Sequence, residues 1–366
     1  MAAQTETMTN RERIYATIEG EEVDRFPVWL KMTNRTWQQS QPEPYNTMGA
    51  KELLSTAGCD LLLGNGVPLE RDNPNVESEI HQEDGLQRHI HSTPDGELVS
   101  EQTFDPYTES WHPTRFPINN VEELKTARWL YKNTEHTVDP VAAKEHARRQ
   151  KDFEEQDVVT MCGVGPSALM DMVEHQAGPV NTIYLMKDEP ELFREVIDLM
   201  HADRMRHLKT HLPHIKSDTF WLTENTSTTL ISPDMFRIFC MPHLHEYGNL
   251  ILEHDIVPVH HMCGTLNNLL ELIDELPALV NEAYTTHPVG DVTLADGRGR
   301  MPSKALIGGT NATLLTRSLD EIVETVAEDL RNCPNRRKIF LTSAGVLPPP
   351  VSFEKAQKIM AEFKKF

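Results

Sequence analysis

Short apolar runs alternate with helix-like segments through most of this 366-residue chain, and this alternation is the feature that most limits its fold. Two such runs, at 24–30 and 59–64, precede residue 65, and six more follow. Strands that pair in parallel need a crossover helix between them. The total of eight β/α units therefore predicts a (β/α)8 barrel (TIM barrel), with a doubly wound open sheet as the alternative. The six later strands are expected at 158–162, 219–223, 257–261, 279–284, 305–309 and 338–342.

The segment 65–150 interrupts this alternation. It carries two turn signals, Glu83-Asp84-Gly85 and Pro94-Asp95-Gly96, between short segments of mixed polarity, which predicts an antiparallel β-hairpin. We expect one barrel domain over residues 1–366, with an N-terminal helical extension at 9–19. The segment 65–150 is then an insert after the second strand that covers part of the barrel. The other helices are expected near 48–58, 120–126, 139–151, 166–176, 189–212, 232–254, 265–275, 318–332 and 352–365.

The balance of charge excludes some classes of partner. The formal net charge is −21, and binding to nucleic-acid phosphates relies on lysine and arginine, so no nucleic-acid partner is expected. No apolar run has the length of a membrane span, and residues 1–10 lack the features of a signal peptide, so we expect a cytoplasmic protein. The five cysteines are scattered without a spacing framework, which favours a reduced compartment. A homo-oligomer is compatible with the sequence, which does not define the oligomeric state.

The stretch 256–264 ends in His261-x-Cys263-Gly264, where an apolar strand passes into a helix-like pattern. Successive strand residues point to opposite faces, so His261 and Cys263 project from the same face. An imidazole and a thiol at a strand end form half of a zinc site, which needs one or two further ligands. The alternative is a packed core pair, because a single cysteine is commonly a small buried hydrophobic residue.

Other predicted strand ends also carry polar side chains, and in a barrel these ends meet at one opening. His260 should point to the opposite face from His261, as a packed histidine hydrogen-bonded behind the barrel or as a group that orients a metal ligand. His243 and His245 are two residues apart in a predicted helix, so they do not share a face and are expected to be structural. The polar strand ends are Asn65, Cys162-Gly163, Glu224-Asn225, His287, Gly309-Thr310-Asn311 and Ser343-Ala344-Gly345.

Motifs along the chain match, in order, those of one protein family. They are the opening segment 9–28 with its Asp-Arg-x-Pro entry to the first strand, then 163–166, 230–236, 261–264 and 308–310, and the proline-rich turn into the last helix. Through them the chain resembles the uroporphyrinogen decarboxylase superfamily, which includes cobalamin-dependent methyltransferases. The resemblance covers nearly the whole chain, is weakest over the insert, and implies a barrel fold.

Within the superfamily the resemblance is to the methyltransferase branch. Decarboxylases carry a Met-Arg-Gln-Ala-Gly-Arg signature and a pocket aspartate, whereas this chain has Lys31-Met-Thr-Asn-Arg-Thr-Trp37 and Gly64-Asn65 at those places. The methyltransferase branch uses zinc, and His261-x-Cys263 matches its motif. Members that methylate a free thiol have a further cysteine in a Gly-Cys-Gly turn, where this chain has Ser343-Ala344-Gly345. One usual zinc ligand is therefore missing.

The replacement ligand must come from another strand end. Glu224 is the first choice, with His287 and Cys162 in reserve. A site with one thiolate leaves Zn²⁺ a stronger Lewis acid than a site with two, which suits polarising an ether oxygen. The other substrate contacts are expected from Trp29 and Asn65, together with Cys162 and His287.

The resemblance therefore implies a zinc-dependent methyltransferase of an O-demethylase system. It would transfer a methyl group from an O-methyl small molecule, such as an aromatic methyl ether, to a corrinoid (cobalamin) carried by a cognate partner protein. The first alternative is a methylcorrinoid:thiol methyltransferase that acts on a coenzyme thiol or homocysteine. The second is a metal-free decarboxylase of the uroporphyrinogen type, and the third is a non-catalytic binding protein with a structural metal.

Overall fold

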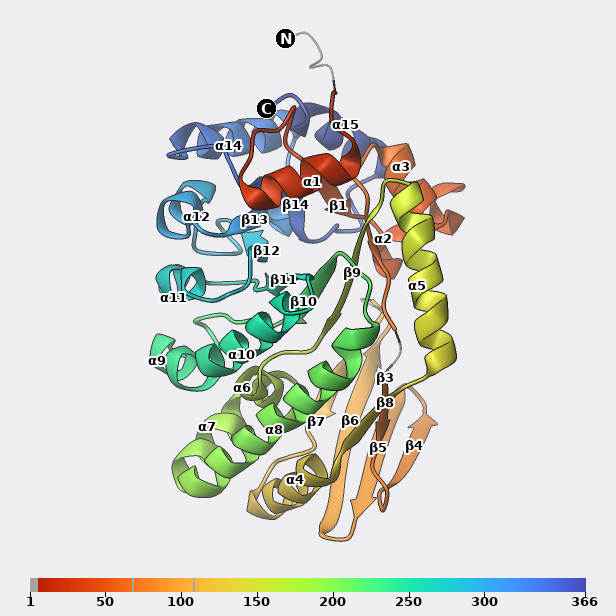
Figure 1. The fold of residues 1–366 in the computed structure, drawn as a ribbon, viewed down its shortest axis with the longest axis vertical. Helices are drawn as coiled ribbons and strands as arrows, with labels where there is room; N and C mark the ends of the chain where they lie inside the picture. Colours follow the sequence, from red (N-terminus) through yellow and green to blue (C-terminus); the bar gives the residue numbers. More distant parts are fainter. Residues whose placement is uncertain (1–5, 68, 108) are drawn as a thin grey trace.

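The computed structural model describes residues 6–67, 69–107 and 109–366. These residues form a barrel of eight parallel strands, as predicted (Figure 1). The strand order is β1-β14-β13-β12-β11-β10-β9-β2, so the last barrel strand pairs with the first and the open-sheet alternative is wrong. The barrel strands are β1 (Val28–Lys31), β2 (Leu62–Gly64), β9 (Val159–Val164), β10 (Thr219–Thr223), β11 (Val257–His261), β12 (Val280–Thr285), β13 (Ala305–Thr310) and β14 (Ile339–Val346).

Helices surround the barrel, and the first lies at the predicted N-terminal extension (Figure 1). Thr9 and Glu12 cap it in a capping box, and Arg11 ties it to the barrel by a hydrogen bond to Val158 O (2.7 Å) and an ion pair with Asp218 (2.6 Å). The helices are α1 (Asn10–Glu19), α2 (Arg35–Gln39), α3 (Ala50–Ala57), α4 (Val121–Asn133), α5 (Pro140–Glu155), α6 (Ala168–Asp171), α7 (Gly178–Asp188), α8 (Pro190–His211), α9 (Pro233–Met235), α10 (Met241–Leu252), α11 (Leu270–Asp274), α12 (Leu294–Arg300), α13 (Ala312–Leu315), α14 (Leu319–Asn332) and α15 (Phe353–Phe363). Shorter turns are the 3₁₀ segments η1 (Tyr45–Thr47) and η3 (Leu212–His214) and the π-helical segments η2 (Met172–Gln176) and η4 (Phe236–Cys240).

The helices differ from the prediction in a few places. α2, α7, α12 and α13 were not predicted. α12 contains two glycines, which weaken helix propensity and hide its pattern. A capping box between Thr293 and Asp296 fixes its start. The predicted helices 166–176 and 232–254 each contain a π-helical turn, and the predicted helix 265–275 is confined to α11. Within the described ranges, no helix combines the length and apolar character needed to cross a membrane.

The insert between β2 and β9 contains more than the predicted hairpin. Strands β4 (Glu77–Glu83), β5 (Leu86–Thr93), β6 (Gly96–Asp105) and β7 (Ser110–Arg115) form a four-stranded antiparallel sheet. Both predicted turns are confirmed, and residues 84 and 85 have φ of 46° and 77°, as a two-residue type I′ turn requires.

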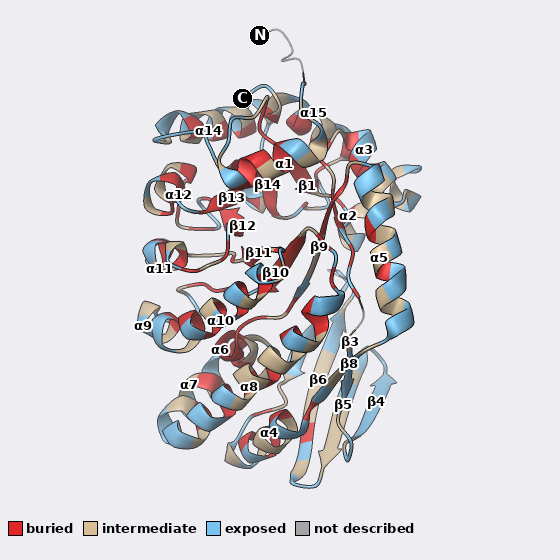
Figure 2. Ribbon diagram, in the orientation of Figure 1, coloured by how far each residue is buried: buried red, intermediate tan, exposed pale blue. Residues whose placement is uncertain are grey.

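A second strand pair links the insert to the helices around the barrel. β3 (Leu69–Asp72) pairs antiparallel with β8 (Glu135–Val138), and β8 packs against α8. α4 packs against β6 and α8, whereas β4 is exposed along its whole length (Figure 2). The insert sheet is therefore covered at its centre and open to solvent at its β4 edge.

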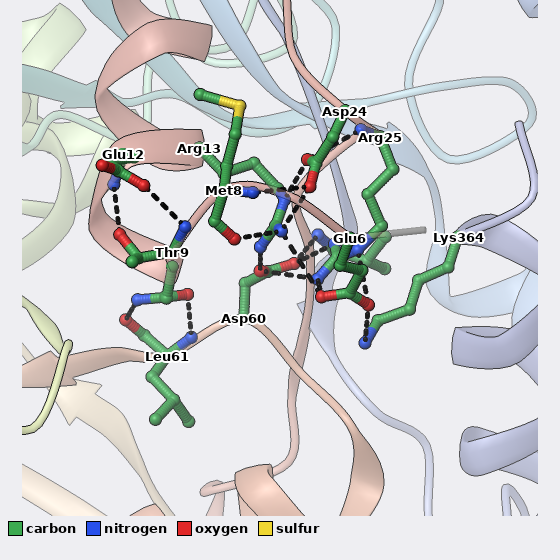
Figure 3. A network of polar contacts seen from close by, with 12 residues as sticks. Glu6, Met8, Thr9, Glu12, Arg13, Asp24, Arg25, Asp60, Leu61 and Lys364 are labelled. Atoms are coloured by element: carbon green, nitrogen blue, oxygen red, sulfur yellow. Dashed lines mark hydrogen bonds and ion pairs between the residues drawn. The ribbon is translucent and has the colours of Figure 1, made fainter. Parts of the chain in front are cut away.

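β1 and β2 stand at the two ends of the strand order, and a buried carboxylate bridges them. Asp60 N donates to Val28 O at 2.8 Å, and the Asp60 carboxylate accepts the Val28 N–H at 2.7 Å. The same carboxylate pairs with Arg13 (2.9 Å) and Arg25 (2.7 Å), and Asp24 pairs with Arg13 at 2.7 Å (Figure 3). This group, called the seam cluster below, joins the two strands at their amino-terminal ends.

Candidate active site

The direction of side chains inside the barrel follows from two tryptophans. Trp29 on β1 and Trp221 on β10 are not on neighbouring strands, yet their ring centroids lie 6.3 Å apart, edge to face. Both side chains therefore point into the barrel. Thr223 lies two residues after Trp221 and is in register with His261, which is in register with Glu282. These residues face the interior at the carboxyl ends of the strands, where barrels carry their active sites.

A chain of ionic contacts crosses this end of the barrel. Glu282 is fully buried, with Lys31 Nζ of β1 at 2.6 Å from its Oε1 and His261 Nδ1 hydrogen-bonded to its Oε2. Burial alone would raise the pKa of Glu282, but the charge of Lys31 and the hydrogen bond with His261 lower it. Because Nδ1 of His261 is engaged by the carboxylate, Nε2 is the ring nitrogen left for a metal.

The structure places Cys263 close enough to His261 for the thiol to affect the pKa of the imidazole. Burial alone would lower the pKa of His261, but the interactions with Cys263 and Glu282 raise it to about 9. A ligating imidazole must be neutral, so binding of a metal would displace the extra proton. Lys31, His261, Cys263 and Glu282 are called the mouth cluster below.

Asn225 and Glu174 extend the mouth cluster toward η2. Asn225 Nδ2 donates to Glu174 Oε2 at 2.8 Å, and Cys263 Sγ lies 3.7 Å from Asn225 Oδ1. Burial raises the pKa of Glu174, and the hydrogen bond from Asn225 opposes this shift. Glu174 Oε1 is buried and has no hydrogen-bond partner among the described residues. A buried, unpartnered carboxylate oxygen on a π-helical turn makes Glu174 a candidate ligand, since such turns are frequent at functional sites.

Glu224, the predicted third ligand, is fully buried and turned toward Ser167. The backbone N–H and the hydroxyl of Ser167 donate to its two carboxylate oxygens, each at 2.6 Å. Burial raises the pKa of Glu224 to about 7, although the Ser167 hydrogen bonds oppose the shift. The structure does not bring Glu224 together with His261 and Cys263 into a three-donor group, and its role as a ligand stays a prediction.

Two of the predicted substrate contacts, Trp29 and Asn65, lie on opposite sides of the barrel wall. Trp29 is inside, 3% exposed, with Lys31 Nζ 5.8 Å from its ring centroid, and its Nε1 has no hydrogen-bond partner among the described residues. Asn65 donates to Gln150 Oε1 at 2.9 Å and accepts from Arg149 at 3.2 Å. Trp29 therefore adjoins the mouth cluster, whereas Asn65 attaches α5 to the end of β2.

The other two predicted contacts also separate. Cys162 is in register with Phe220, whose ring packs against His211 of α8, so this face of the strands looks toward the helices. Burial raises the pKa of Cys162 to about 12, as expected for a thiol packed away from water. His287 is exposed on the loop after β12. Neither residue joins the mouth cluster, and their roles as substrate contacts or reserve ligands stay predictions.

The remaining histidines behave largely as structural residues. His260 is 1% exposed on the opposite face from His261, and burial lowers its pKa to about 3. Neither ring nitrogen of His260 has a partner among the described residues, so the expected hydrogen bond behind the barrel is wrong. His243 stacks on His201 of α8 with centroids 4.0 Å apart, which agrees with a structural role.

Three members of this site were not predicted from the sequence: Lys31, Glu174 and Glu282. Glu282 had a visible signal, because it is a carboxylate inside the otherwise apolar run 279–284. Lys31 directly follows the first apolar run, and only closure of the barrel brings it to Glu282. The sequence around Glu174 predicts an ordinary helix and carries no sign of the π-helical turn.

Zinc fits one half of this site. Nε2 of His261 and Sγ of Cys263 are donors that zinc prefers. In the part of the chain that the structure describes, no three His, Cys, Asp or Glu side chains converge closely enough to hold a metal ion. A third donor therefore requires a side chain to move, and the unpartnered oxygen of Glu174 makes it the best-placed one.

A cavity of about 400 Å³ opens at the carboxyl ends of β2, β9 and β10. Trp221 and Thr223 line it, together with Met161, the predicted substrate contact Cys162 and the glycines that follow. A Cβ placed on Gly163 would lie 2.3 Å from Trp221 O, so glycine is required for the strands to approach here. The result is a wide opening with one aromatic wall.

Comparisons with known proteins agree with this fold. Residues 113–366, more than half of the chain, match the family model described as uroporphyrinogen decarboxylase (URO-D). No curated protein matches this chain. Among solved structures, a methyltransferase from Methanosarcina mazei is 15% identical, with a TM-score of 0.64 over 98% of this chain and 99% of that chain. At this identity the likeness shows the fold alone.

Two further solved structures match less well. One, from Listeria monocytogenes, is described as a vitamin-B12-independent methionine synthase (15% identity, TM-score 0.35, 59% of this chain and 69% of that chain). The other is a D-psicose 3-epimerase (9% identity, TM-score 0.36, 61% of this chain and 81% of that chain). Both scores are too low to support an argument. The match over residues 113–366 is sufficient, and the chain belongs to the uroporphyrinogen decarboxylase family.

Proposed function

We propose that this protein is a zinc-dependent methyltransferase that moves a methyl group from an O-methyl compound to a corrinoid carried by a partner protein. The observation that carries the proposal is the pair His261 and Cys263 at the barrel mouth. Glu282 fixes the ring of His261 through Nδ1, which is the arrangement that metal-binding histidines commonly have. The fold likeness to a methyltransferase supports the same reading.

His261 Nε2 and Cys263 Sγ would hold the zinc ion, and we propose Glu174 as the third donor in place of Glu224. When bound, the ion would act as a Lewis acid on the ether oxygen of the substrate. Ala344 is 6% exposed where thiol-methylating relatives are expected to carry a second thiolate, so the donor set would be less electron-rich. This favours demethylation of an ether over activation of a thiol.

The residues around the half-site have positioning roles. Lys31 stabilises the negative charge of Glu282 through an ion pair, and Glu282 keeps the His261 ring in one orientation through a hydrogen bond. Asn225 stands between Cys263 and Glu174, so it can keep the carboxylate close to the thiol before a metal binds. These contacts keep the donor side chains in place.

The cavity beside Trp221 suits a flat methyl donor, and an aromatic methyl ether is the proposed class. In the transfer, the cobalt(I) electron pair forms the carbon–cobalt bond while the methyl carbon–oxygen bond breaks. The phenolate then leaves with the bonding pair. The site must stay open to the partner, because a corrinoid on another protein has to reach the methyl carbon.

The test is a methyl-transfer assay with zinc-loaded protein, chemically reduced cob(I)alamin and a panel of methoxylated aromatic compounds. We expect methylcobalamin and the matching phenol to form in equal amounts, and we expect His261→Ala to abolish both. A thioether formed from methylcobalamin and a thiol panel would instead favour the thiol methyltransferase. Release of carbon dioxide that persists after full chelation would favour the metal-free decarboxylase. Activity of His261→Ala equal to that of the wild type would contradict the proposal.

A further inference from the structure

The cavity at the carboxyl ends of β2, β9 and β10 stands out in this chain, because none of the described residues that line it carries a charge. Three glycines line it together with Met161, Cys162, Val164, Trp221 and Thr223. By contrast, a cavity of about 390 Å³ at the amino-terminal end of the barrel has both acidic and basic side chains in its wall. Charged residues make up 25% of the chain, so an uncharged wall restricts the class of ligand.

This cavity adjoins the zinc half-site through strand β10. Thr223 lines the cavity and is the register partner of His261 on the neighbouring strand β11. Neighbouring strands lie about 4.8 Å apart, so an aromatic ring that rests between Trp221 and Thr223 can present a methoxy substituent to His261 and Cys263. Thr223 and Gly163 are exposed, so a ligand in the cavity can contact both.

Charged side chains around the cavity already have ionic partners. Lys31 Nζ is 2.6 Å from the buried carboxylate of Glu282, so this pair offers no net charge to a ligand. Arg204 approaches Gly165 from α8, outside the barrel, and lies 3.6 Å from the carboxylate of Asp171. Neither cation is therefore free to pair with a charged ligand.

Arg149 lies near the β2 end of the cavity but is also engaged. Its Nε donates to Asn65 Oδ1 at 3.2 Å, and its Nη2 donates to Gly66 O at 3.0 Å. Arg149 belongs to α5, which lies outside the barrel (Figure 1). Its guanidinium therefore attaches α5 to the loop after β2 and does not line the cavity.

A charged ligand would lose part of its hydration in this cavity without gaining a counter-charge. Transfer of an unpaired charge away from water is costly, and the cost here is moderate because the cavity is open and part of the hydration remains. An uncharged aromatic ring loses much less, and it gains contact with the Trp221 ring. The hydroxyl of Thr223 can share a hydrogen bond with a neutral polar substituent.

We infer that the methyl donor is an uncharged methoxyarene, such as a neutral methoxyphenol, and not a methoxybenzoate or a cationic methoxyarene. The inference rests on the proposed function, because it assigns the cavity to the methyl donor of that reaction. Charge develops only on the ether oxygen as the methyl group leaves, and this oxygen lies at the zinc half-site and not in the cavity. The cavity therefore selects the ring, whereas the half-site carries the charge.

The test is calorimetric titration of the full chain with three probes of equal shape and different charge: 3-methoxybenzamide, 3-methoxybenzoate and 3-methoxybenzamidine. The titrations are run on zinc-loaded protein and repeated after chelation, because a carboxylate can bind zinc directly. We expect the neutral amide to bind about tenfold more tightly than either ion after chelation. Equal or tighter binding of the benzoate or the benzamidine after chelation would overturn the inference, and so would failure of the amide to bind.

A variant that adds a charge to the cavity provides a second measurement. Thr223→Arg should tighten binding of the benzoate about tenfold and weaken binding of the benzamidine, because a guanidinium pairs with a carboxylate. Thr325→Arg is the matched control, since Thr325 is exposed on α14, outside the barrel, and it should leave the ranking of the probes unchanged. An equal gain for the benzoate in both variants, or no gain in Thr223→Arg, would contradict the inference.

Methyl transfer from the same three compounds to cob(I)alamin is assayed separately, so that the two proposals can fail independently. Preferred binding of the amide without any methyl transfer would support an uncharged ligand and contradict the proposed function. Methyl transfer together with equal binding of the amide and the benzoate would support the proposed function and contradict the selection of an uncharged donor.

Discussion

The seam cluster and the mouth cluster have the same arrangement of charges at opposite ends of the barrel strands. Each centres on a buried carboxylate between two cations: Asp60 between Arg13 and Arg25, and Glu282 between Lys31 and His261. The partners differ. Arginine stays charged and binds through a fork, whereas His261 is a group that can exchange a proton for a metal.

Because of this difference, we assign the seam cluster to the stability of the fold and the mouth cluster to its chemistry. Asp60 also accepts the Val28 N–H, so the seam cluster replaces part of the sheet ladder between β1 and β2. The mouth cluster makes no such ladder contact, and Glu174 beside it keeps a buried oxygen without a partner. In barrels, the amino-terminal end generally serves stability and the carboxyl end serves function, and these two clusters follow that division.

The largest expected effect comes from breaking the seam. Asp60→Ala leaves Arg13 and Arg25 buried without their shared counter-charge, which should lower the free energy of unfolding by about 3–5 kcal/mol. Chemical denaturation measures this. Asp234→Ala, which removes a carboxylate that is 83% exposed, is the control and should stay within about 0.5 kcal/mol. A loss below about 1 kcal/mol for Asp60→Ala would show that the seam does not depend on this group.

A pH series tests the same cluster at Asp24. Burial alone would raise the pKa of Asp24, but hydrogen bonds from Arg13 and from the backbone of Met8 and Thr7 lower it well below its ordinary value. A carboxyl whose folded-state pKa is depressed stabilises the fold above its unfolded pKa, and this contribution is lost as the pH falls through the folded value. We expect Asp24→Asn to cost roughly 2 kcal/mol above pH 5 or so, and less below about pH 4. Urea denaturation at several pH values measures it, and a cost that grows toward acid pH would contradict the account.

At the mouth, two carboxylates compete for the role of third ligand. If Glu174 supplies the third donor, Glu174→Gln should weaken zinc binding by about 100-fold, the upper end of effects known for groups around a metal. Glu224→Gln should leave the zinc affinity nearly unchanged, because Glu224 is held by Ser167. Competition with a chromogenic chelator measures both affinities. The reverse order would restore Glu224 as the ligand.

A smaller effect is expected at Glu282, which orients His261 without contacting the metal. Glu282→Gln should weaken zinc binding by about tenfold. Glu79→Gln is a matched control, since Glu79 also pairs with a histidine, His81, at 2.9 Å but on the exposed strand β4. We expect no change in zinc affinity for the control. An equal response of both variants would remove the positioning role of Glu282.

The sequence predicted the barrel well because every barrel strand is an apolar run followed by a change of pattern. α12 was missed because its two glycines mask its helical character, and tertiary contacts hold it in place. The pair His261 and Cys263 followed from strand alternation alone. That rule stops at a strand end: Asn225 takes a left-handed φ of 48°, so the directions of Glu224 and Asn225 could not be read from alternation. The Lys31–Glu282 contact spans the closed barrel, and no local pattern predicts it.

The central claim is that His261 and Cys263 form the firm half of a zinc site, and its most direct test is the zinc content of purified variants. We predict about one zinc per chain for the wild type and for Cys333→Ala, whose cysteine lies at the end of α14. We predict almost none for Cys263→Ala, with the circular dichroism spectrum unchanged. Full zinc content in Cys263→Ala, or a wild-type protein that takes up no zinc when supplied with it, would contradict the account.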